Sequence, residues 1–468
     1  MTRKRSGFSI ILILTGVLNV AAMSREEMME HAFRHSEKLE QVELERLKVE
    51  SLRKEYTAKG FPEINADLNY LYQPRAYSPF DFGPFPSVSE MMDPTEPGFG
   101  NSARLAGTMD QLFSSLDLSP RKQAFKWEVN AVQPIFAQGK IFTGVQLAGL
   151  YGQLISHQRE QVQFDLAEQV SHTYFLALVA EENVRIREGA LELAEEAHAI
   201  AVRRFDVGQG NQLDTLNSRY TLQQEIYQLQ EARKNRRLAN HKLLTTISLE
   251  MDPDSLVLSD TLSRPPLSMT FAQAREQMLQ NNSILKTLRK GKQIQEKQTA
   301  LTRTDYFPTV YAGMSLGQTS QHDEIRDMDL SRDSWDVKFF TGINVPIWNG
   351  GQRRHRMTQA VKEELQVASQ IKEAEDLLTL KLSAAFEEYQ LALENLAATN
   401  ELLTLARRGL SVAERAFTVG QTTQLELNQN QQNYNMSRLA YTDALHQLTS
   451  AYTTIQKLIG NPQLILNQ

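Results

Sequence analysis

Two carboxylates and three guanidinium groups begin or end a short sequence that the chain contains twice. The stretch RRFDVGQGNQLD at 203–214 recurs about 212 residues later as RAFTVGQTTQLE at 415–426. The charged residues at its ends are Arg203, Arg204, Asp214, Arg415 and Glu426. Exposed arginines can form ion pairs with acids on a neighbouring helix, although isolated pairs contribute only about 0–1 kcal/mol. A carboxylate three residues after a polar cap residue can accept hydrogen bonds at the start of a helix.

Each copy also has the residues that end one helix and start the next. Gly208 and Gly420 follow apolar residues of helical spacing, where glycine commonly ends a helix in the left-handed region. The two pairs with the separation of a capping box, or of a close relative of one, are Asn211 with Asp214 and Thr423 with Glu426. The sequence therefore predicts two helical hairpin tips, at which each carboxylate helps to start the returning helix.

Other residues that carry chemistry are scarce or scattered. His31 and His35 lie four residues apart on a predicted helix, a spacing that suits a metal ion, but no third ligand is near and a surface pair is favoured. The chain has no cysteine, which excludes disulfides, thiolate metal sites and a lipid-bearing N-terminal cysteine. It has no phosphate-binding loop and no nucleophile elbow. We therefore predict no enzyme, no metal site and no cofactor.

Two proline-free stretches of about 65 residues position the repeated sequence. From about 138 to 205 and from about 352 to 417, apolar residues recur three or four apart, which predicts amphipathic helices with a narrow apolar stripe. At 1.5 Å per residue, each helix would be about 100 Å long. Shorter return helices are predicted at about 211–248 and 423–459. Such long helices cannot form one globular core, so we expect them to pack side by side in a coiled-coil-like array.

Four extended segments alternate apolar and polar residues, as strands with one apolar face do. They lie at about 63–73, 123–135, 309–318 and 335–347. Their polar face carries the charges of Lys126, Glu128, Asp336 and Lys338. This pattern is typical of transmembrane barrel strands, although a half-buried soluble sheet is an alternative. Four strands cannot close a barrel around a channel, so a barrel would be shared by several chains.

The repetition extends over most of the chain. The matching pairs outside the tips include Pro134-Ile135-Phe136 with Pro346-Ile347-Trp348, and Phe61-Pro62 with Phe307-Pro308. We therefore expect a first repeat at 23–250, a linker at 251–270 and a second repeat at 271–468. Residues 1–22 have the basic start, apolar run and small-residue site of a secretory signal peptide. Residues 73–118, rich in proline and glycine, predict a long irregular loop.

Composition argues against two further classes of protein. The 468 residues have a hydrophobic content of 41% and a net charge of −6 with both signs mixed, and the mean hydropathy is −0.41. These values argue against a helical membrane protein and give no argument for a nucleic-acid partner. After the N-terminal run, no stretch is long and apolar enough to cross a bilayer as a helix.

Taken together, these features resemble the TolC family of outer-membrane efflux proteins. The resemblance covers nearly all of the chain after residue 22 and rests on the paired FP segments, the PIF and PIW junctions and the two F-x-V-G-Q-x-x-Q-L-(D/E) tips. It implies a mainly α fold with a small β part. In a homotrimer, each protomer would give four strands to an outer-membrane β-barrel and its helices to a long α-helical barrel in the periplasm. The missing N-terminal cysteine resembles the non-lipidated branch of this Gram-negative family.

The resemblance also implies partners and a role for the tips. Family members join an inner-membrane pump of RND or ABC type through a periplasmic adaptor, or serve type I secretion. Their tips form the periplasmic entrance and meet the adaptor. The corresponding residues here are Phe205, Val207, Gly208, Gln209, Phe417, Val419, Gly420 and Gln421.

Acidic residues beside the second tip ring the constriction in the family. Glu426 matches the first of these acids, whereas Gln429 falls where better-known members carry a second one. Asp214 is the acid that follows the first tip. A trimer would present three Glu426 carboxylates, and a carboxylate ring can select cations. Gating and helix capping are compatible roles for Glu426, and the sequence leaves both open.

Two functions from different classes follow from these patterns. The first is a passive trimeric export duct of the outer membrane, in contact with lipid and driven by a separate pump. The alternative is a periplasmic or secreted structural coiled-coil protein without a membrane barrel. The alternating strands favour the duct, because a scaffold has no need of an aromatic-rich outer face. A receptor role for the loop at 73–118 would be an addition to the duct.

Overall fold

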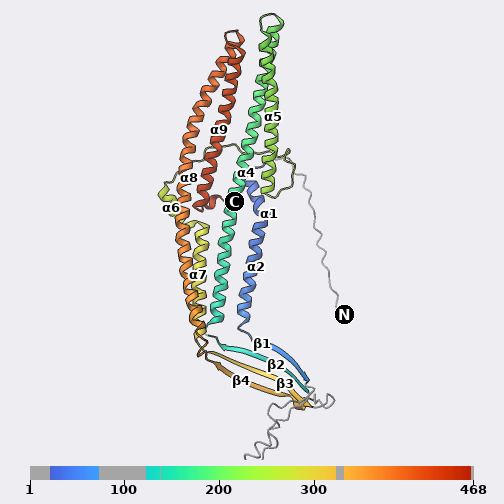
Figure 1. Ribbon diagram of the computed structural model, residues 1–468, viewed down its shortest axis with the longest axis vertical. Helices are drawn as coiled ribbons and strands as arrows, with labels where there is room; N and C mark the ends of the chain where they lie inside the picture. Colours follow the sequence, from blue (N-terminus) through green and yellow to red (C-terminus); the bar gives the residue numbers. More distant parts are fainter. Residues whose placement is uncertain (1–21, 73–122, 138, 323–330, 465–468) are drawn as a thin grey trace, which may run out of the picture. The chain divides into compact units, whose positions relative to one another are not determined.

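The computed structural model describes residues 22–72, 123–137, 139–322 and 331–464 (Figure 1). The expected signal peptide, apart from Ala22, and the long loop at 73–118 lie outside these residues. The described chain forms two compact units, and each unit contains parts of both sequence repeats. The helical unit comprises the described residues up to Leu52, Leu147–Thr299 and those from Thr358 onward. The strand unit comprises the described residues of Arg53–Gln146 and Ala300–Met357.

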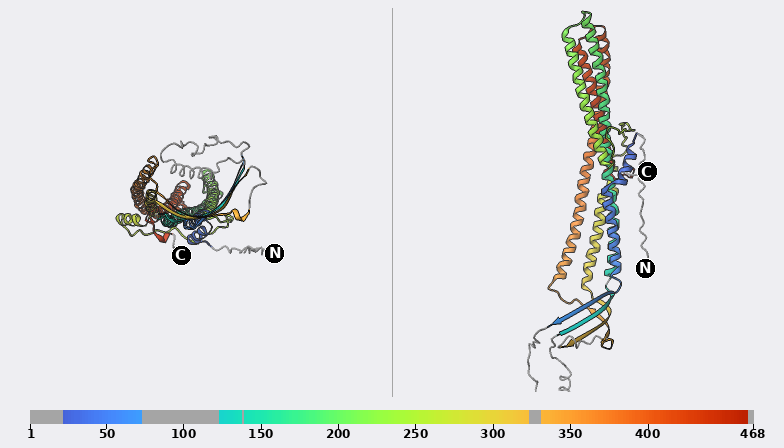
Figure 2. Two further views of the ribbon diagram at one scale, coloured as in Figure 1. Left: turned by 90° about the horizontal axis from the view of Figure 1, so that it is seen from below. Right: turned by 90° about the vertical axis from the view of Figure 1, so that its right-hand side faces the viewer.

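Two long helical hairpins make up most of the helical unit. α4 (Lys140–Asp206) returns as α5 (Gln212–Thr246), and α8 (Gln352–Thr418) returns as α9 (Gln424–Leu458). The views in Figures 1 and 2 agree that these hairpins run side by side. The shorter α-helices of the described residues are α1 (Arg25–His35), α2 (Glu37–Ala58), α6 (Phe271–Asn281) and α7 (Ser283–Arg303). Among the described helices, none combines the length and apolar composition needed to cross a membrane.

Two apolar clusters attach the hairpins to the shorter helices. In the first, Tyr174 of α4 packs with Leu243 of α5 and Met28 of α1. In the second, Leu382 of α8 packs with Met278 of α6. All five side chains are fully buried. α1 and α6 therefore have equivalent roles in the two repeats, and both start with a capping box, which supplies partners for their first free N–H groups.

Polar contacts connect one hairpin to the other. Lys457 of α9 lies 2.6 Å from Asp165 and 2.7 Å from Glu168, both on α4. Farther along α9, Arg438 pairs with Glu182 of α4 at 2.9 Å. These pairs fix the positions of α4 and α9 relative to each other, because each cation on α9 meets an acid on the facing helix.

The strand unit contains one antiparallel sheet of four strands. Its strands are β1 (Glu63–Tyr72), β2 (Gln123–Phe136), β3 (Thr309–His322) and β4 (Asp336–Asn344). They pair in the order β1-β2-β3-β4, so that the hairpin of the first repeat lies beside that of the second. β1 and β4 are the two edges, and within the described residues neither has a partner on its outer side. The expected mainly α fold with a small β part is confirmed.

The register collects the alternating apolar residues on one face of the sheet. One row across this face consists of Ile64, Ala131, Met314 and Phe339, and the next consists of Ala66, Val129, Leu316 and Val337. The other face carries two ion pairs, Lys126 with Glu128 and Asp336 with Lys338, each at 2.6 Å. Gly313 also faces this side, because an added Cβ there would lie 2.4 Å from the Phe340 ring.

Two strand ends differ from the expected positions. β4 ends at Asn344, whereas the alternation suggested a strand to residue 347. β4 ends where its partner begins, because Asn344 pairs with Thr309, the first residue of β3. β3 continues to His322, past the expected end at 318, because its partner β2 continues to pair with it as far as Gln123.

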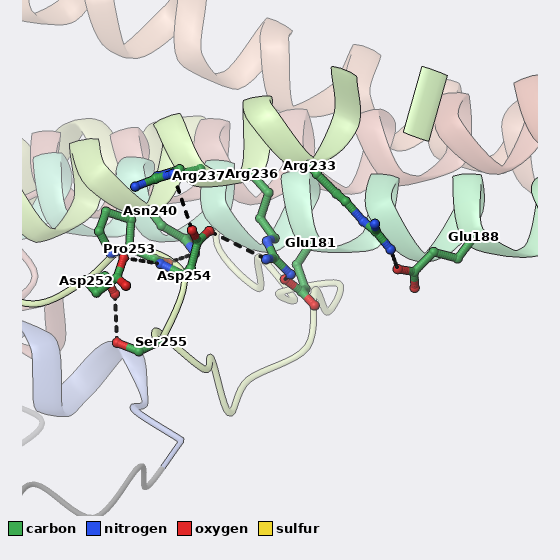
Figure 3. A network of polar contacts seen from close by, with 10 residues as sticks. All are labelled: Glu181, Glu188, Arg233, Arg236, Arg237, Asn240, Asp252, Pro253, Asp254 and Ser255. Atoms are coloured by element: carbon green, nitrogen blue, oxygen red, sulfur yellow. Dashed lines mark hydrogen bonds and ion pairs between the residues drawn. The ribbon is translucent and has the colours of Figure 1, made fainter. Parts of the chain in front are cut away.

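The segment between α5 and α6 is tied to the first hairpin by polar groups (Figure 3). Asn240 of α5 donates from Nδ2 to the Pro253 carbonyl at 2.9 Å. The Asp254 carboxylate lies 3.8 Å from the guanidinium of Arg236 and 3.6 Å from that of Arg237. These contacts begin to fix a linker that has little regular structure of its own.

Two buried tyrosines fix the rest of this linker. The Tyr174 hydroxyl donates to the Met23 carbonyl at 3.2 Å and accepts from the Asp260 N–H at 3.3 Å. The Tyr389 hydroxyl of α8 donates to the Pro265 carbonyl at 3.0 Å and accepts from the Leu267 N–H at 3.2 Å. Each long helix therefore holds the linker through one phenol, and burial raises the pKa of the Tyr174 hydroxyl, so it remains a donor at neutral pH.

Replacing Tyr174 by phenylalanine should lower the free energy of unfolding by about 1–3 kcal/mol, because the Met23 carbonyl and the Asp260 N–H would lose a buried partner. The shift is measured by guanidinium-induced unfolding followed by circular dichroism. Tyr220→Phe is the matched control, since Tyr220 is 72% exposed on α5. Equal midpoints for the two variants would contradict this role of Tyr174.

Candidate functional site

The two tips end their long helices in the same way. At the first tip, Gln209 N–H donates to the Arg204 carbonyl at 2.8 Å and Gly208 N–H donates to the Phe205 carbonyl at 3.0 Å. The second tip repeats both bonds with Gln421, Gly420, Ala416 and Phe417, at 2.9 and 3.1 Å. This is the Schellman arrangement, in which the residue after the helix is left-handed. Gly208 and Gly420 have φ of 73° and 80°, which only glycine adopts without strain.

The return helices start differently at the two tips. Thr423 and Glu426 form the expected capping box, in which each side chain accepts from the other's backbone N–H. Asn211 instead accepts from the Leu213 N–H at 3.1 Å, and Asp214 takes part through its own N–H, which donates to the Asn211 carbonyl. The full box is therefore found at the second tip, and the first tip has a close relative of it, in which the Asn211 side chain caps one residue earlier.

The Glu426 carboxylate is exposed and strongly hydrogen-bonded. It accepts from the Thr422 hydroxyl and from the Thr423 N–H at 3.1 Å. These bonds lower the pKa of the Glu426 carboxyl, so the group remains ionised at neutral pH while it caps α9. Gln429, one turn later, is also exposed and donates to Asn433 on its own helix at 3.1 Å. Asp214 lies on the other return helix and is half-buried.

The apolar residues of the tips do not have equal surroundings. Val207 and Val419 are each 69% exposed, and Phe205 is 45% exposed. Phe417, which matches Phe205 in the repeat, is only 4% exposed and packs with Leu427 of α9 and Ala197 of α4. The first tip therefore presents an aromatic ring at the surface, whereas the second uses the equivalent ring as core.

Arg204 joins the two tips. Its Nη2 donates to the Phe417 carbonyl at 2.5 Å and to the Thr418 carbonyl at 3.3 Å, and its guanidinium lies 4.7 Å from the centre of the Phe417 ring. A cation at the carboxyl end of α8 is favoured by the helix dipole as well as by the ring. We expected arginine to pair with acids, and Arg204 binds carbonyl oxygens instead. Arg203 and Arg415 donate to carbonyls of their own helices.

Three polar residues beside the tips were missed by sequence reasoning. Gln424 is 2% exposed and donates to Asn428 at 2.8 Å, and Asn428 donates to Thr221 of α5 at 3.0 Å. This chain links the two return helices. The only sequence signal was the amide-rich run after the second tip, which reads equally well as a solvated surface.

A second missed feature is the environment of Glu414, which lies on α8 just before the second tip. Burial and the charge of Glu196 on α4 raise the pKa of the Glu414 carboxyl. The two residues are 218 positions apart, so their spacing in the sequence gave no sign of this interaction.

His31 and His35 do not have the geometry of a metal site. Their rings stack at 4.2 Å, and each Nδ1 donates to a carbonyl, that of Ile247 at 3.1 Å and that of His31 at 3.0 Å. Across the described residues, no group of three or more metal-ligating side chains has a suitable arrangement.

Most of the chain matches a known family. The outer membrane efflux protein family model matches residues 28–247 and 274–461. The chain belongs to this family. The gap between the matched segments, residues 248–273, coincides with the linker that Tyr174 and Tyr389 hold.

Individual relatives of this outer membrane efflux protein are distant in sequence. Outer membrane efflux protein BepC of Brucella suis is 25% identical over 279 residues, 59% of each chain. Cobalt-zinc-cadmium resistance protein CzcC of Cupriavidus metallidurans is 20% identical over 328 residues, 70% of this chain and 75% of CzcC. The aligned region thus spans less than two thirds of BepC.

The fold is also that of solved outer membrane channels. The CmeC outer membrane channel of Campylobacter jejuni superimposes with a TM-score of 0.71 over 93% of this chain and 85% of CmeC, at 13% identity. The MtrE outer membrane channel of Neisseria gonorrhoeae gives 0.69 over 93% and 88%, at 14% identity. The expected family and the TolC-like fold are confirmed, and the protein is placed in the outer membrane by its family.

Replacing Arg204 of this efflux protein by alanine should loosen the end of α8. Loss of the bonds to Phe417 and Thr418 should cost about 1 kcal/mol locally and speed hydrogen exchange of amides 417–421 roughly five- to tenfold. Exchange is measured by mass spectrometry on the full chain. Arg203→Ala is the control, because Arg203 is exposed and bonds its own helix. Unchanged exchange in Arg204→Ala would show that the tips are not joined by this residue.

Proposed function

We propose that the protein is the outer-membrane duct of a tripartite efflux or type I secretion system. In this role it is passive, and an inner-membrane pump of RND or ABC type drives export through a periplasmic adaptor. The observation that carries the proposal is the combination of an apolar-faced sheet with open edges and long helices that keep apolar residues exposed. Both features call for further copies of the chain around a common axis. Transport through such an assembly requires no catalytic site in the chain.

The first support for several copies is the surface of α8. One side of this helix is buried in the chain through residues such as Leu382, Tyr389 and Leu410. Another side keeps seven large apolar residues at least half exposed: Leu365, Leu377, Leu380, Leu391, Leu402, Leu405 and Val412. Leu380, Leu391 and Leu402 are 11 residues apart, about three helical turns, so they form one straight stripe. A helix that is apolar on two sides needs a partner on both.

α5 carries a matching stripe. Leu213, Leu216, Tyr220, Tyr227 and Leu238 are separated by about whole helical turns, and each is more than half exposed. The stripes on α5 and α8 lie on different hairpins, so one copy can present α5 to α8 of the next. Such a head-to-tail contact closes into a ring when the rotation from one copy to the next is a whole fraction of a full turn. We propose a ring of three copies.

The sheet supports the same arrangement. β1 and β4 are open edges of a sheet with one apolar face, and open edges tend to pair with another chain. If β4 of each protomer pairs with β1 of the next, three protomers form a closed barrel of twelve strands. The apolar rows that contain Ile64 and Phe339 would then face lipid, and the charged side of the sheet would face the lumen.

The tips are proposed as the adaptor-docking surface and periplasmic entrance. Phe205, Val207, Gln209, Val419 and Gln421 are exposed there on backbones fixed by Schellman turns. Phe417 and the two glycines would support this surface rather than contact the adaptor. Three ionised Glu426 carboxylates would line the entrance and favour cations, and Gln429 would add no second ring of charge.

The alternative, a structural coiled-coil protein without a barrel, predicts a different biochemistry. Without a membrane, another part of the protein or a partner would have to cover the apolar side chains of the sheet. Ile64, Leu68 and Phe339 are each about 70–80% exposed. Membrane fractionation and heat-modifiability distinguish the two proposals. A soluble monomer with unchanged gel mobility on heating would rule out the duct.

The interface is tested by a charge placed on the α8 stripe. Leu391→Glu combined with Leu402→Glu should reduce the trimer fraction at least tenfold, because each carboxylate would lose its water on assembly. Analytical ultracentrifugation in detergent measures the oligomer. Leu44→Glu is the matched control, since Leu44 of α2 is 59% exposed and Leu391 is 58% exposed. A native oligomer in the double variant would remove the helical part of the proposal.

The role of Glu426 is tested by two variants that separate charge from capping. Glutamine can serve in a capping box, as Gln273 does with Thr270 in this chain. Glu426→Gln should therefore keep the cap, while Glu426→Ala loses it. Both should lower cation-over-anion permeability roughly severalfold in single-channel recordings if the carboxylates gate cations. Glu426 would have only its capping role if two results were found together. Glu426→Ala would change hydrogen exchange at the start of α9, and neither variant would change the cation selectivity.

A further inference from the structure

A pocket of about 320 Å³ lies in the strand unit where β4 gives way to α8. Its lining includes Lys140, Asp305, Phe307, Trp348, Arg353 and Arg356. Three cations and a single acid thus meet beside two aromatic rings. None of these residues belongs to the tips or to the proposed contact between copies.

The positive charge of this pocket exceeds what its own acid can balance. Lys140 pairs with Asp305 at 2.7 Å. Arg353 is 8% exposed and is held by the Pro346 carbonyl at 2.6 Å and the Asp305 carbonyl at 3.4 Å, so its guanidinium has no carboxylate among these partners. Arg356, one turn later, is exposed. The pocket therefore has a surplus of positive charge.

The start of α8 increases this surplus. Its first turn contains no acid, and the sequence Gln352-Arg353-Arg354-His355-Arg356 places basic residues where the helix dipole is itself positive. The equivalent run in the first repeat reads Lys140-Ile141-Phe142-Thr143-Gly144 and contains one cation. A junction between strand and helix therefore does not require this charge, which suggests a ligand specific to the second repeat.

The rim of the pocket is apolar. Trp348 is 84% exposed and the preceding Ile347 is 90% exposed. Phe307, which lines the pocket, is 54% exposed. Large exposed side chains of this kind at the ends of membrane strands are typical of the zone where lipid headgroups meet acyl chains. A free phosphate ion would use the cations and leave this apolar rim uncovered.

We propose that the pocket binds the headgroup of an anionic phospholipid. The lipid phosphate would lie among Arg353, Arg356 and Lys140, and the upper part of the acyl chains would cover Trp348 and Ile347. Basic pockets at the membrane surface bind anionic headgroups by this combination of charge and apolar contact. The lipid would anchor the junction of β4 and α8.

Trp348 provides the reporter for this site. The full chain is reconstituted in vesicles of phosphatidylcholine with phosphatidylglycerol, and one lipid at a time carries bromine on its acyl chains as a quencher. The chain has two other tryptophans, so quenching is measured for the native chain and for Trp348→Phe. The difference between the two is the quenching of Trp348 fluorescence. We expect brominated phosphatidylglycerol to quench with about fivefold greater apparent affinity than brominated phosphatidylcholine, the effect of one interfacial cation.

Substitutions at Arg356 identify the cation responsible. Arg356→Glu should reduce the ratio of apparent affinities, phosphatidylglycerol over phosphatidylcholine, to about one. Arg356→Lys should retain most of the native ratio. Arg408→Glu is the control, because Arg408 is also exposed on α8 but lies in the helical unit. The lipid preference of Arg408→Glu should equal that of the native chain. For every variant, hydrogen exchange of α8 equal to that of the native chain shows that the fold is kept.

Three outcomes would overturn the proposal. Equal quenching by the two brominated lipids in the native chain would show a membrane contact without headgroup selection. An undiminished preference in Arg356→Glu would place the selection elsewhere. Displacement of brominated phosphatidylglycerol by inorganic phosphate at constant ionic strength would show that the pocket is a site for the free anion.

Discussion

The structure depends on one constraint: a helix of 67 residues exposes more apolar surface than its own hairpin partner can cover. α9 and α5 are only 35 residues long, so each long helix needs additional partners. Within the chain, α1 and α6 complete the two apolar clusters, and the linker is held beside them by Tyr174 and Tyr389. What remains exposed on α8 is ordered into a stripe, unlike leucines that are exposed singly over a surface.

Much of the fold was predictable because its patterns are periodic. Helical spacing located the two long helices to within about two residues at each end, and period-two alternation located all four strands. The end of β4 depends on its pairing with Thr309, the first residue of β3, and alternation within one segment does not show this pairing. The extension of β3 could not have been foreseen, because it depends on the pairing of β2 from the other repeat.

The site was predictable in position and much less so in its contacts. The repeated VGQ sequence located both tips, yet the same phenylalanine is exposed in one copy and buried in the other. Arg204 has no counterpart in the second copy, where Ala416 stands, and this difference marks the residue that crosses between the tips. Its carbonyl partners carry no signal in the sequence, because every residue has a carbonyl. The family model establishes the family, and solved channels at 13–14% identity establish the fold, but neither identifies which side chains act at the tips.

The Schellman turns at the tips have an evolutionary consequence. Their shape is set by main-chain hydrogen bonds and by Gly208 and Gly420, while the neighbouring Val207 and Val419 are 69% exposed and carry none of these bonds through their side chains. Mutation can therefore alter the chemistry of the exposed positions and leave the backbone of the hairpin unchanged. A lineage can in this way change the side chains that the tips present by single substitutions, without passing through an unfolded intermediate.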